Sequence, residues 1–430
     1  MGWKDNKNLG SWAFTKQADK PSYNEGDHIA TYESPIWSMV EGSNVPITPT
    51  HKPCGYWTKD YVLPPPLYSL YFYIAESTGL IKIARISRSS FTFVDYMSMA
   101  ANEAGCQARG VLRKNNNRNI AYKDANGNSY VGDNQTTIQG RIIKFNLSTM
   151  IRIGAISIVT EDNRAIFGGV VDSTGTYSYW LNMFSSYYGE KCLQKVDMET
   201  FSIVTSISDI YGAGKGIGYN SSIEIDEANN RIYVVVYRVD PYYLSVMYFS
   251  ISPFAYVGAV LNVAPGYCNN NNIYSSGLTR IGTKVLFIGH TSTTSNTGPG
   301  VLVRANVPNI DGVTSLIFDT AEGNACGLVI DSAGQYAYVF CRTNVNPGTF
   351  SVVKVDITTT PMTKIGSVGV SAAGLAAGGI AIDEIKGYIY FSNVNVSGRV
   401  HRVSISPFAY VGYMDFPAGQ YPYYDIFTED

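Results

Sequence analysis

The stretch Gly327–Asp356, GLVIDSAGQYAYVFCRTNVNPGTFSVVKVD, decides the fold. It begins with an apolar run closed by Asp331, followed by a short Ser-Ala-Gly turn and a second apolar run through Tyr338. A polar loop then leads into a third run that ends in Lys354-Val355-Asp356. Because apolar and polar residues alternate with a period of two, the stretch predicts β-strands joined by a tight turn and then by a longer loop.

The same pattern recurs along most of the chain, and its spacing gives the repeat length. An aspartate followed seven residues later by a tyrosine marks four copies, at Asp172, Asp226, Asp331 and Asp383. Asn115 with Tyr122 marks a degenerate copy, and successive anchors lie 57, 54, 105 and 52 residues apart. The gap of 105 residues conceals a copy at Arg280–Gly289, and one more lies upstream at Leu67–Ala75. The count is therefore seven copies of roughly 50 residues.

The third run of each copy gives an independent count. It carries a basic residue, an apolar residue and then Asp, Asn or Ser, with the basic residue at Arg85, Lys144, Lys195, Arg304, Lys354 and Arg402. In the remaining copy Tyr248 takes the basic position, and the segment Ser250–Gly258 (SISPFAYVG) returns unchanged at Ser404–Gly412. We expect the basic side chains to lie along their neighbours and the repeated aspartates to cap their own turns.

Seven copies of four short strands, with almost no helical periodicity, predict an all-β fold, a seven-bladed β-propeller. The repeats resemble those of seven-bladed propellers of the YVTN/NHL-like class. The resemblance covers roughly residues 67–416, the propeller. Residues 1–66 do not fit the repeat and are predicted to be an N-terminal extended docking arm, and residues 417–430 form a C-terminal tail. The resemblance implies a fold and no particular function, since propellers serve enzymes, receptors and scaffolds alike.

The arm is polar and interrupted by prolines, yet it holds four tryptophans, which are rare in disordered tails. We therefore expect it to be ordered, with Trp3, Trp12 and Trp37 as assembly contacts to other protein subunits. Pro64–Pro66 remove three backbone donors, so the first blade lacks an obvious inner strand. Either Tyr56–Val62 or the tail segment Gly419–Thr428 would supply that strand and close the ring.

Composition excludes several classes of protein. Charged residues make up 15% of the chain and the formal net charge is −2, so no basic excess is present for binding nucleic acid. No apolar run reaches the roughly 18 residues of a membrane span, and the chain as given begins without the apolar segment of a secretory signal. The six cysteines lack paired spacing, which predicts buried free thiols, with a bridge between Cys326 and Cys341 left open.

No catalytic or cofactor-binding motif is recognisable. The four histidines form no metal-ligand spacing, and only His290 falls in a loop expected on a propeller face. We therefore expect no catalytic residues, no metal and no cofactor, and predict that the protein is not an enzyme. A propeller hydrolase or lactonase, the least favoured alternative, would need acids, histidines or metal ligands gathered at the mouth of the axis.

Aromatic residues in the expected long loops are the predicted ligand-binding residues. Phe184, Tyr187 and Tyr188 fall in one such loop, and Tyr242 and Tyr243 fall in the equivalent loop of the next copy. Aromatic rings stack on sugars and on proteins, while neighbouring Asn and Ser side chains supply hydrogen bonds. The alternative is that these rings cover the rim or pack between blades.

Two functions follow from this pattern. The favoured one is a non-catalytic structural or recognition component of a larger assembly, above all a virion or phage-tail surface protein, with other subunits and a glycan or host receptor as partners. The alternative is a secreted or cell-surface adhesin or lectin-like protein that binds glycans. Both place the protein on a virion or extracellular surface.

Overall fold

The computed structural model describes a chain built almost wholly from β-strands. The described residues are 13–14, 39–40, 69–76, 81–98, 110–115, 120–132, 140–157, 166–182, 191–208, 222–239, 242–260, 277–291, 298–342, 349–371, 376–394, 398–417 and 420–428. The chain divides into two compact units, Met1–Pro65 and Pro66–Asp430. In the first unit the described residues form an antiparallel pair, β1 (Ala13–Phe14) and β2 (Met39–Val40).

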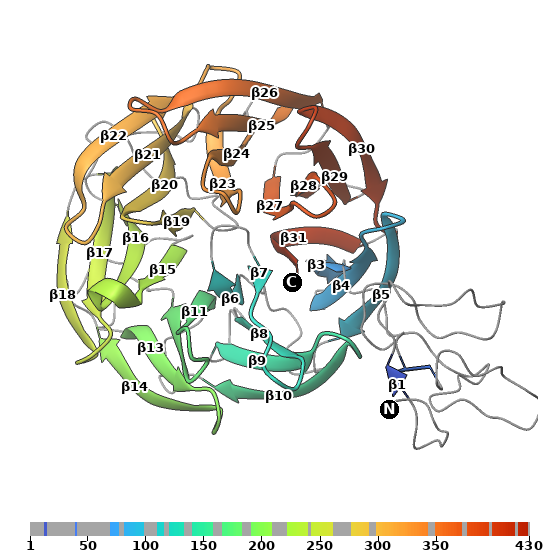
Figure 1. Cartoon of the computed structure of the whole chain (residues 1–430), viewed down its shortest axis with the longest axis vertical. Coiled ribbons are helices and arrows are strands. Elements are labelled where there is room, and N and C mark those ends of the chain that lie inside the picture. Colours follow the sequence, from blue (N-terminus) through green and yellow to red (C-terminus); the bar gives the residue numbers. More distant parts are fainter. Residues whose placement is uncertain are drawn as a thin grey trace, which may run out of the picture. The chain divides into compact units, whose positions relative to one another are not determined.

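In the second unit the strands lie around a central axis in antiparallel sets of four, with one strand of each set near the axis and one at the rim (Figure 1). Four sets are separate sheets. The first two are β15 (Ser222–Asp226), β16 (Arg231–Val239), β17 (Tyr242–Ser250) and β18 (Ala255–Val260), then β19 (Leu278–Ile281), β20 (Lys284–His290), β21 (Gly300–Asn306) and β22 (Asp311–Ile317). The other two are β23 (Asn324–Ile330), β24 (Tyr336–Arg342), β25 (Thr349–Asp356) and β26 (Thr363–Ser371), then β27 (Ala376–Asp383), β28 (Tyr388–Val394), β29 (Arg399–Ser404) and β30 (Ala409–Asp415).

Three further sets are joined into one sheet by parallel pairing near the axis. They are β31 (Gln420–Thr428), β3 (Ser69–Glu76), β4 (Ile81–Ser87) and β5 (Thr92–Ser98), then β6 (Gly110–Asn115), β8 (Asn128–Gly132), β9 (Arg141–Asn146) and β10 (Ile151–Ser157), then β11 (Ile166–Val171), β12 (Tyr177–Asn182), β13 (Lys191–Asp197) and β14 (Ser202–Ser208). The short strand β7 (Ile120–Ala121) lies between β6 and β8 in the chain. We refer to these sets as blades, numbered 1 to 7 from the one that contains β3. The all-β propeller fold is confirmed.

The inner strand of blade 1 comes from the C-terminal end of the chain. β31 pairs antiparallel with β3, so that Phe427 lies opposite Tyr71 and their rings stack with centres 5.4 Å apart. Of the two segments considered for this strand, it is therefore the tail that pairs, and Tyr56–Val62 lies outside the described residues. The tail belongs to the same compact unit as the blades.

Aromatic contacts between neighbouring blades recur around the ring. The second strand of most blades carries a buried tyrosine, and a phenylalanine from the turn between the third and outer strands of the next blade packs against it. The four such pairs have ring centres 5.5 to 6.1 Å apart: Tyr130 with Phe201, Tyr179 with Phe254, Tyr338 with Phe408, and Tyr390 with Phe91. The last of these pairs joins blade 7 to blade 1. The aspartate-to-tyrosine repeat of the sequence is thus the signature of blade packing.

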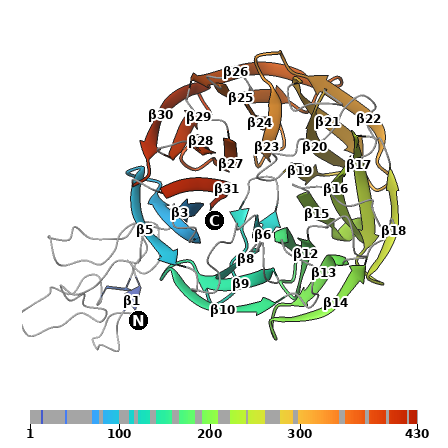
Figure 2. The same cartoon turned by 180° about the vertical axis from the view of Figure 1, so that it is seen from behind.

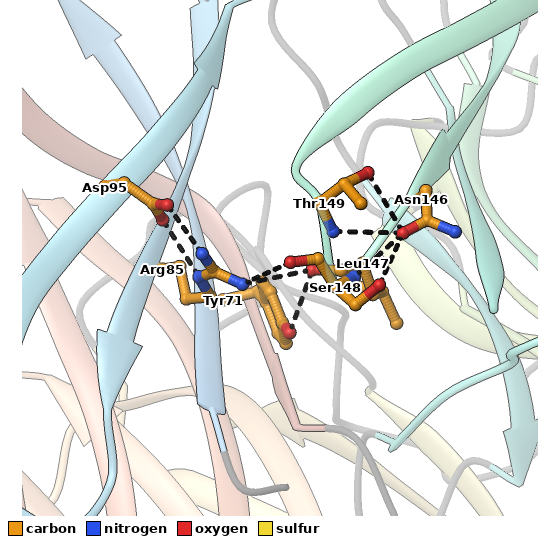
Figure 3. Close-up of polar contacts among 7 residues, drawn as sticks. All are labelled: Tyr71, Arg85, Asp95, Asn146, Leu147, Ser148 and Thr149. Carbon is orange, nitrogen blue, oxygen red and sulfur yellow. Dashed lines mark hydrogen bonds and ion pairs between the residues drawn. The ribbon is translucent and has the colours of Figure 1, made fainter. Parts of the chain in front are cut away.

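The repeated basic residue of the third strand reaches the next blade. Arg85 forms a bidentate ion pair with Asp95 on its own sheet, at 2.9 and 2.6 Å, and donates to the backbone carbonyl of Ser148 in blade 2 at 2.8 Å (Figure 3). Arg304 of blade 5 likewise donates to the carbonyl of Ile357 in blade 6 at 2.7 Å. In blade 6, Lys354 instead lies over the rings of its neighbours. The expectation that these side chains lie along their neighbours is confirmed.

Three of the four repeated aspartates cap their own turns by accepting backbone N–H groups, as predicted. The exception is Asp226, which makes no such bond and accepts from the Asn229 side chain at 2.8 Å. Asp172 accepts hydrogen bonds from the backbone N–H groups of Thr176 and Tyr177 at 2.9 and 3.0 Å, and Asp331 does the same in its blade. In blade 2 this role belongs to Asp124, which also accepts from the Tyr130 hydroxyl at 2.8 Å. The assignment of Asn115 and Tyr122 as that blade's anchors is therefore wrong, because β7 is inserted between β6 and the capped turn.

Several expected loops are shorter than predicted. Residues 123–140 and 237–245 are both predicted to be loops between second and third strands. The first contains β8, and in the second only residues 240–241 separate β16 from β17. His290 is the last residue of β20 rather than a loop residue, and it pairs with Gly300. Cys326 and Cys341 are buried free thiols, so no bridge joins them.

Candidate functional site

A carboxylate occupies an apolar position of the repeat on the inner strand of blade 4. In the sequence Ser222-Ile-Glu-Ile-Asp226, Ile223 packs into the core cluster between blades 3 and 4, and Glu224 is only 5% exposed. Counted from the repeated aspartate, Glu224 stands where the other anchored copies carry Val170, Val329 and Ala381. Acidic side chains are rarely buried unless they have partners, so its surroundings matter.

Glu224 is held by backbone donors from two inner strands. Its Oε2 accepts the N–H of Arg280 on β19 at 2.9 Å, and its Oε1 accepts the N–H of Ile225 at 3.0 Å. The Arg280 guanidinium lies 3.4 Å from Oδ1 of the fully buried Asp226 and donates to the carbonyl of Gly282 at 2.7 Å. The carboxylate therefore joins blades 4 and 5 close to the axis, where Figure 2 shows β15 and β19 side by side.

A second guanidinium approaches from blade 2. Arg113 on β6 is buried, and a Cβ atom added at Gly168 of β11 would lie 3.5 Å from its Nη1. Gly168 has a φ of +138°, which favours glycine, and the Arg113 guanidinium lies within van der Waals distance of its Cβ position, so the arginine reaches from blade 2 to β11 of blade 3. The Arg113 charge reaches Glu224 and lowers its pKa.

Opposing effects set the protonation of Glu224. Burial raises the pKa of its carboxyl strongly, while the two backbone N–H donors and the charges of Arg280 and Arg113 lower it. The resulting pKa is about 7. A carboxyl group that gains and loses its proton near neutral pH, beside fixed cations, can act as a general acid or base.

Further buried polar residues lie in blades 5 and 6, around the start of inner strand β23. Asn324 begins this strand opposite Arg342, and both are buried, as are Glu322 and His290. Gly300, the partner of His290 in β21, donates its N–H to the carbonyl of Glu322 at 2.9 Å. The Glu322 carboxylate accepts from Nζ of Lys364 on the outer strand β26 at 2.6 Å, so its charge is paired away from Glu224.

The predicted site residues are only partly placed by the structure. Phe184, Tyr187 and Tyr188 lie outside the described residues, as do the arm residues Trp3, Trp12 and Trp37. Tyr242 and Tyr243 are the first two residues of β17, paired with Val239 and Arg238, so their assignment to a loop is wrong. Their role in binding a ligand stays a prediction.

Sequence reasoning missed Glu224 because its strand reads as an ordinary alternation of apolar and polar residues. The available signal was the comparison of copies, in which one inner strand replaces a small or apolar residue by an acid. Arg113 could not be found by comparing the copies, because the residues predicted to anchor the repeat in blade 2, Asn115 and Tyr122, are not its true anchors.

The described ranges contain neither a cluster of metal ligands nor a membrane-spanning helix. Within them, no three His, Cys, Asp or Glu side chains gather as ligands for one metal ion. The described part of the chain holds no helix with the length and apolar character needed to cross a membrane.

Comparisons with known proteins support the fold. No protein-family model matches the chain, and no curated protein sequence matches it. Among solved structures, a periplasmic gluconolactonase from Pseudomonas aeruginosa is similar with a TM-score of 0.57 and 12% identity, over 84% of this chain and 99% of that one. A protein from Bacteroides fragilis named as a 6-phosphogluconolactonase has a TM-score of 0.53 and 13% identity, over 84% of this chain and 98% of that one. A protein from Bacteroides uniformis with the same name has a TM-score of 0.56 and 10% identity, over 84% and 99%.

These neighbours correct the prediction that the protein is not an enzyme. The prediction took the absence of a recognisable motif as evidence against catalysis, but structures of the same fold are named as gluconolactonases, which are hydrolases. That prediction is therefore wrong. At 10–13% identity the likeness itself shows the fold alone, so any activity of this chain has to be argued from its own residues.

Proposed function

We propose that the propeller is a hydrolase that opens a lactone, with Glu224 as its general base. The observation that carries this proposal is a buried carboxyl group with a pKa of about 7, held between the inner strands of two blades and within reach of the Arg113 charge. A general base works best when its pKa lies near the working pH. The class of substrate is suggested by the names of the structurally similar gluconolactonases.

In this reaction the Glu224 carboxylate takes a proton from a water molecule as the water oxygen adds to the lactone carbonyl carbon. The Arg113 guanidinium stabilises the negative charge that develops on the carbonyl oxygen. The ring C–O bond then breaks, and the proton held by Glu224 passes to the departing oxygen, which gives the hydroxy acid. Water and lactone are the only reactants, and the step balances without a further co-reactant.

The test is hydrolysis of glucono-δ-lactone and of its 6-phosphate by the full chain, followed by acid release and corrected for spontaneous opening. We expect Glu224→Gln to lower kcat/KM at least about 100-fold, as expected when a general base is lost. Glu199→Gln, at an exposed turn, is the control and should retain activity. An enzyme that turns over neither lactone, or a Glu224→Gln variant that is as active as the unaltered chain, would refute the proposal.

A second candidate function is a structural or recognition component of a larger assembly, such as a virion or phage-tail surface, with residues 1–66 contacting other subunits. The observation that favours it is the apolar character of the rim: Ile151 and Ile153 on β10 are 61% and 52% exposed, and Val94 on β5 is 49% exposed. Exposed apolar side chains that gather on one surface often mark protein contacts. Light scattering on material from the natural source tests this function, since a monomer in that material excludes it.

A further inference from the structure

The same nine residues connect the third strand to the outer strand in blades 4 and 7, but the surroundings differ. Ser250–Gly258 and Ser404–Gly412 form equivalent turns into β18 and β30, and in both the leading serine hydroxyl donates to the carbonyl of the following alanine, at 3.3 and 3.1 Å. Beyond this segment the blades differ. Blade 4 pairs Met247 with Ala259, whereas blade 7 pairs His401 with Tyr413 at the same rung. Blade 4 therefore shows the same turn without the histidine and the second tyrosine that blade 7 carries.

A bulge brings two tyrosines of β30 to the same group. The pairing of β29 with β30 shifts by one residue between Arg402 and Val403, and Gly412 adopts a φ of +150°. In a regular strand Tyr410 and Tyr413 would point to opposite faces, but here the centres of both rings lie 6.0 Å from that of His401. The two rings thus form one aromatic surface.

His401 fixes the base of this surface. Its ring stacks on Phe391 with centres 4.9 Å apart, and its Nδ1 lies 3.2 Å from the Tyr410 hydroxyl. Burial lowers the pKa of His401 to about 4, so the imidazole is neutral at physiological pH. Tyr410 and Tyr413 are 39% and 49% exposed. The buried His401 ring therefore contacts both tyrosine rings, and part of each ring is exposed to solvent.

An ion pair flanks the rings. Arg399 donates to Asp415 at 2.7 Å, and its guanidinium carbon lies 4.2 Å from the centre of the Tyr413 ring. The pair balances its own charge and presents hydrogen-bond donors and acceptors side by side. The adjoining blade repeats part of this arrangement at equivalent rungs, because the Lys82 ammonium lies 3.6 Å from the centre of the exposed Tyr96 ring on β5.

We propose that this surface, formed by Tyr410, Tyr413, Arg399 and Asp415, binds a neutral saccharide. A pyranose has a face of C–H groups that packs on a tyrosine ring, and a rim of vicinal hydroxyls that both donate and accept hydrogen bonds. The charge-balanced arginine and aspartate match those hydroxyls and give no preference for an anionic ligand. The surface lies at the rim and is independent of Glu224.

The test is an array of neutral oligosaccharides, including glucans, galactans and mannans, probed with the full chain. We expect binding to at least one class of oligosaccharide. Tyr413→Ala should weaken this binding at least about tenfold, a loss typical of a removed aromatic anchor. This substitution introduces the residue that blade 4 carries at the same rung, Ala259, so the strand should still form. Tyr410→Ala should weaken binding as well, and Tyr256→Ala, at the equivalent position in the identical segment of blade 4, is its matched control and should leave binding unchanged.

Two outcomes overturn the proposal. One is an array on which no neutral oligosaccharide is retained. The other is binding that survives Tyr413→Ala while an unchanged melting temperature shows that the variant is folded.

Discussion

The Glu224 carboxylate on β15 accepts the backbone N–H of Arg280 on β19 at 2.9 Å, so that one acidic side chain joins the inner strands of two neighbouring blades. Inner strands of adjacent blades need no regular hydrogen-bonded ladder between them, and here a side chain makes the link. The same group has a pKa of about 7 because burial outweighs its donors and cations. Glu224 therefore both links the inner strands of blades 4 and 5 and carries the titratable group on which the proposed reaction depends.

The first prediction concerns stability against pH. The folded-state pKa of Glu224 is raised from 4.5 to about 7, so its contribution to the free energy of unfolding is fully present below pH 4.5 and is lost as the pH rises to about 7. Glu224→Gln cannot ionise, and we expect its melting temperature to fall less than that of the unaltered chain between pH 5 and pH 8. Scanning calorimetry at several pH values measures this. Equal slopes for both chains would contradict the assignment, and Glu199→Gln should follow the unaltered chain.

The second prediction concerns a buried ion pair between blade 1 and blade 7, the first and last blades of the ring. Nε of Arg88 in blade 1 lies 3.2 Å from Oδ2 of Asp383 in blade 7, and the two side chains are 3% and 1% exposed. Removing one partner leaves a buried charge, so Asp383→Leu should lower the free energy of unfolding by about 3–5 kcal/mol, and Arg88→Met should also be destabilising. The double variant Arg88→Met, Asp383→Leu should recover much of that loss. Denaturant unfolding of the single and double variants forms the cycle, and additive losses would show that the pair is not coupled.

The third prediction concerns ring closure by β31. Deleting residues 420–430 removes the inner strand of blade 1 and exposes Tyr71 and the edge of β3. We expect the melting temperature to fall by more than about 10 °C, since a drop of this size corresponds to several kcal/mol for a unit of this length. Deleting only residues 429–430, beyond the strand, is the control. An unchanged melting temperature after the longer deletion would mean that β31 does not close the ring.

The fourth prediction concerns Gly168. Its φ of +138° strains any residue with a Cβ atom, and the added atom would lie 3.5 Å from Nη1 of Arg113 and 3.6 Å from the carbonyl oxygen of Val111. We expect Gly168→Ala to cost about 1–3 kcal/mol of stability, the range for strained backbone. Gly154→Ala, on an outer strand where an added Cβ meets nothing within 4 Å, should be neutral in the same unfolding experiment.

The repeat made most of the fold predictable. Asp331 and Tyr338 have counterparts in most blades because one caps a turn and the other packs against the next blade, and both demands recur around the ring. Blade 2 was misaligned because the insertion of β7 separates β6 from Asp124, which alters the spacing on which the repeat was recognised. A period read from sequence fails where a blade accommodates an insertion.

The candidate site was less predictable for a physical reason. Glu224, Arg113 and Arg280 are far apart in sequence and belong to three different blades, so only the packing of blades around the axis brings them together. The prediction of aromatic loop residues relied on loop lengths, and two of those residues, Tyr242 and Tyr243, begin a strand instead. Tyr413 went unnoticed because strand alternation hides the effect of the bulge at Gly412.

The most direct test of the central claim is the dependence of kcat/KM for lactone hydrolysis on pH, measured for the unaltered chain and for Arg113→Gln. We expect activity to rise with an apparent pKa near 7 in the unaltered chain, because the carboxylate form of Glu224 is the base. Arg113→Gln removes a charge that lowers this pKa, so the midpoint should move to higher pH. A profile without a midpoint between pH 6 and pH 8, or a midpoint that does not move in the variant, would contradict the role of Glu224.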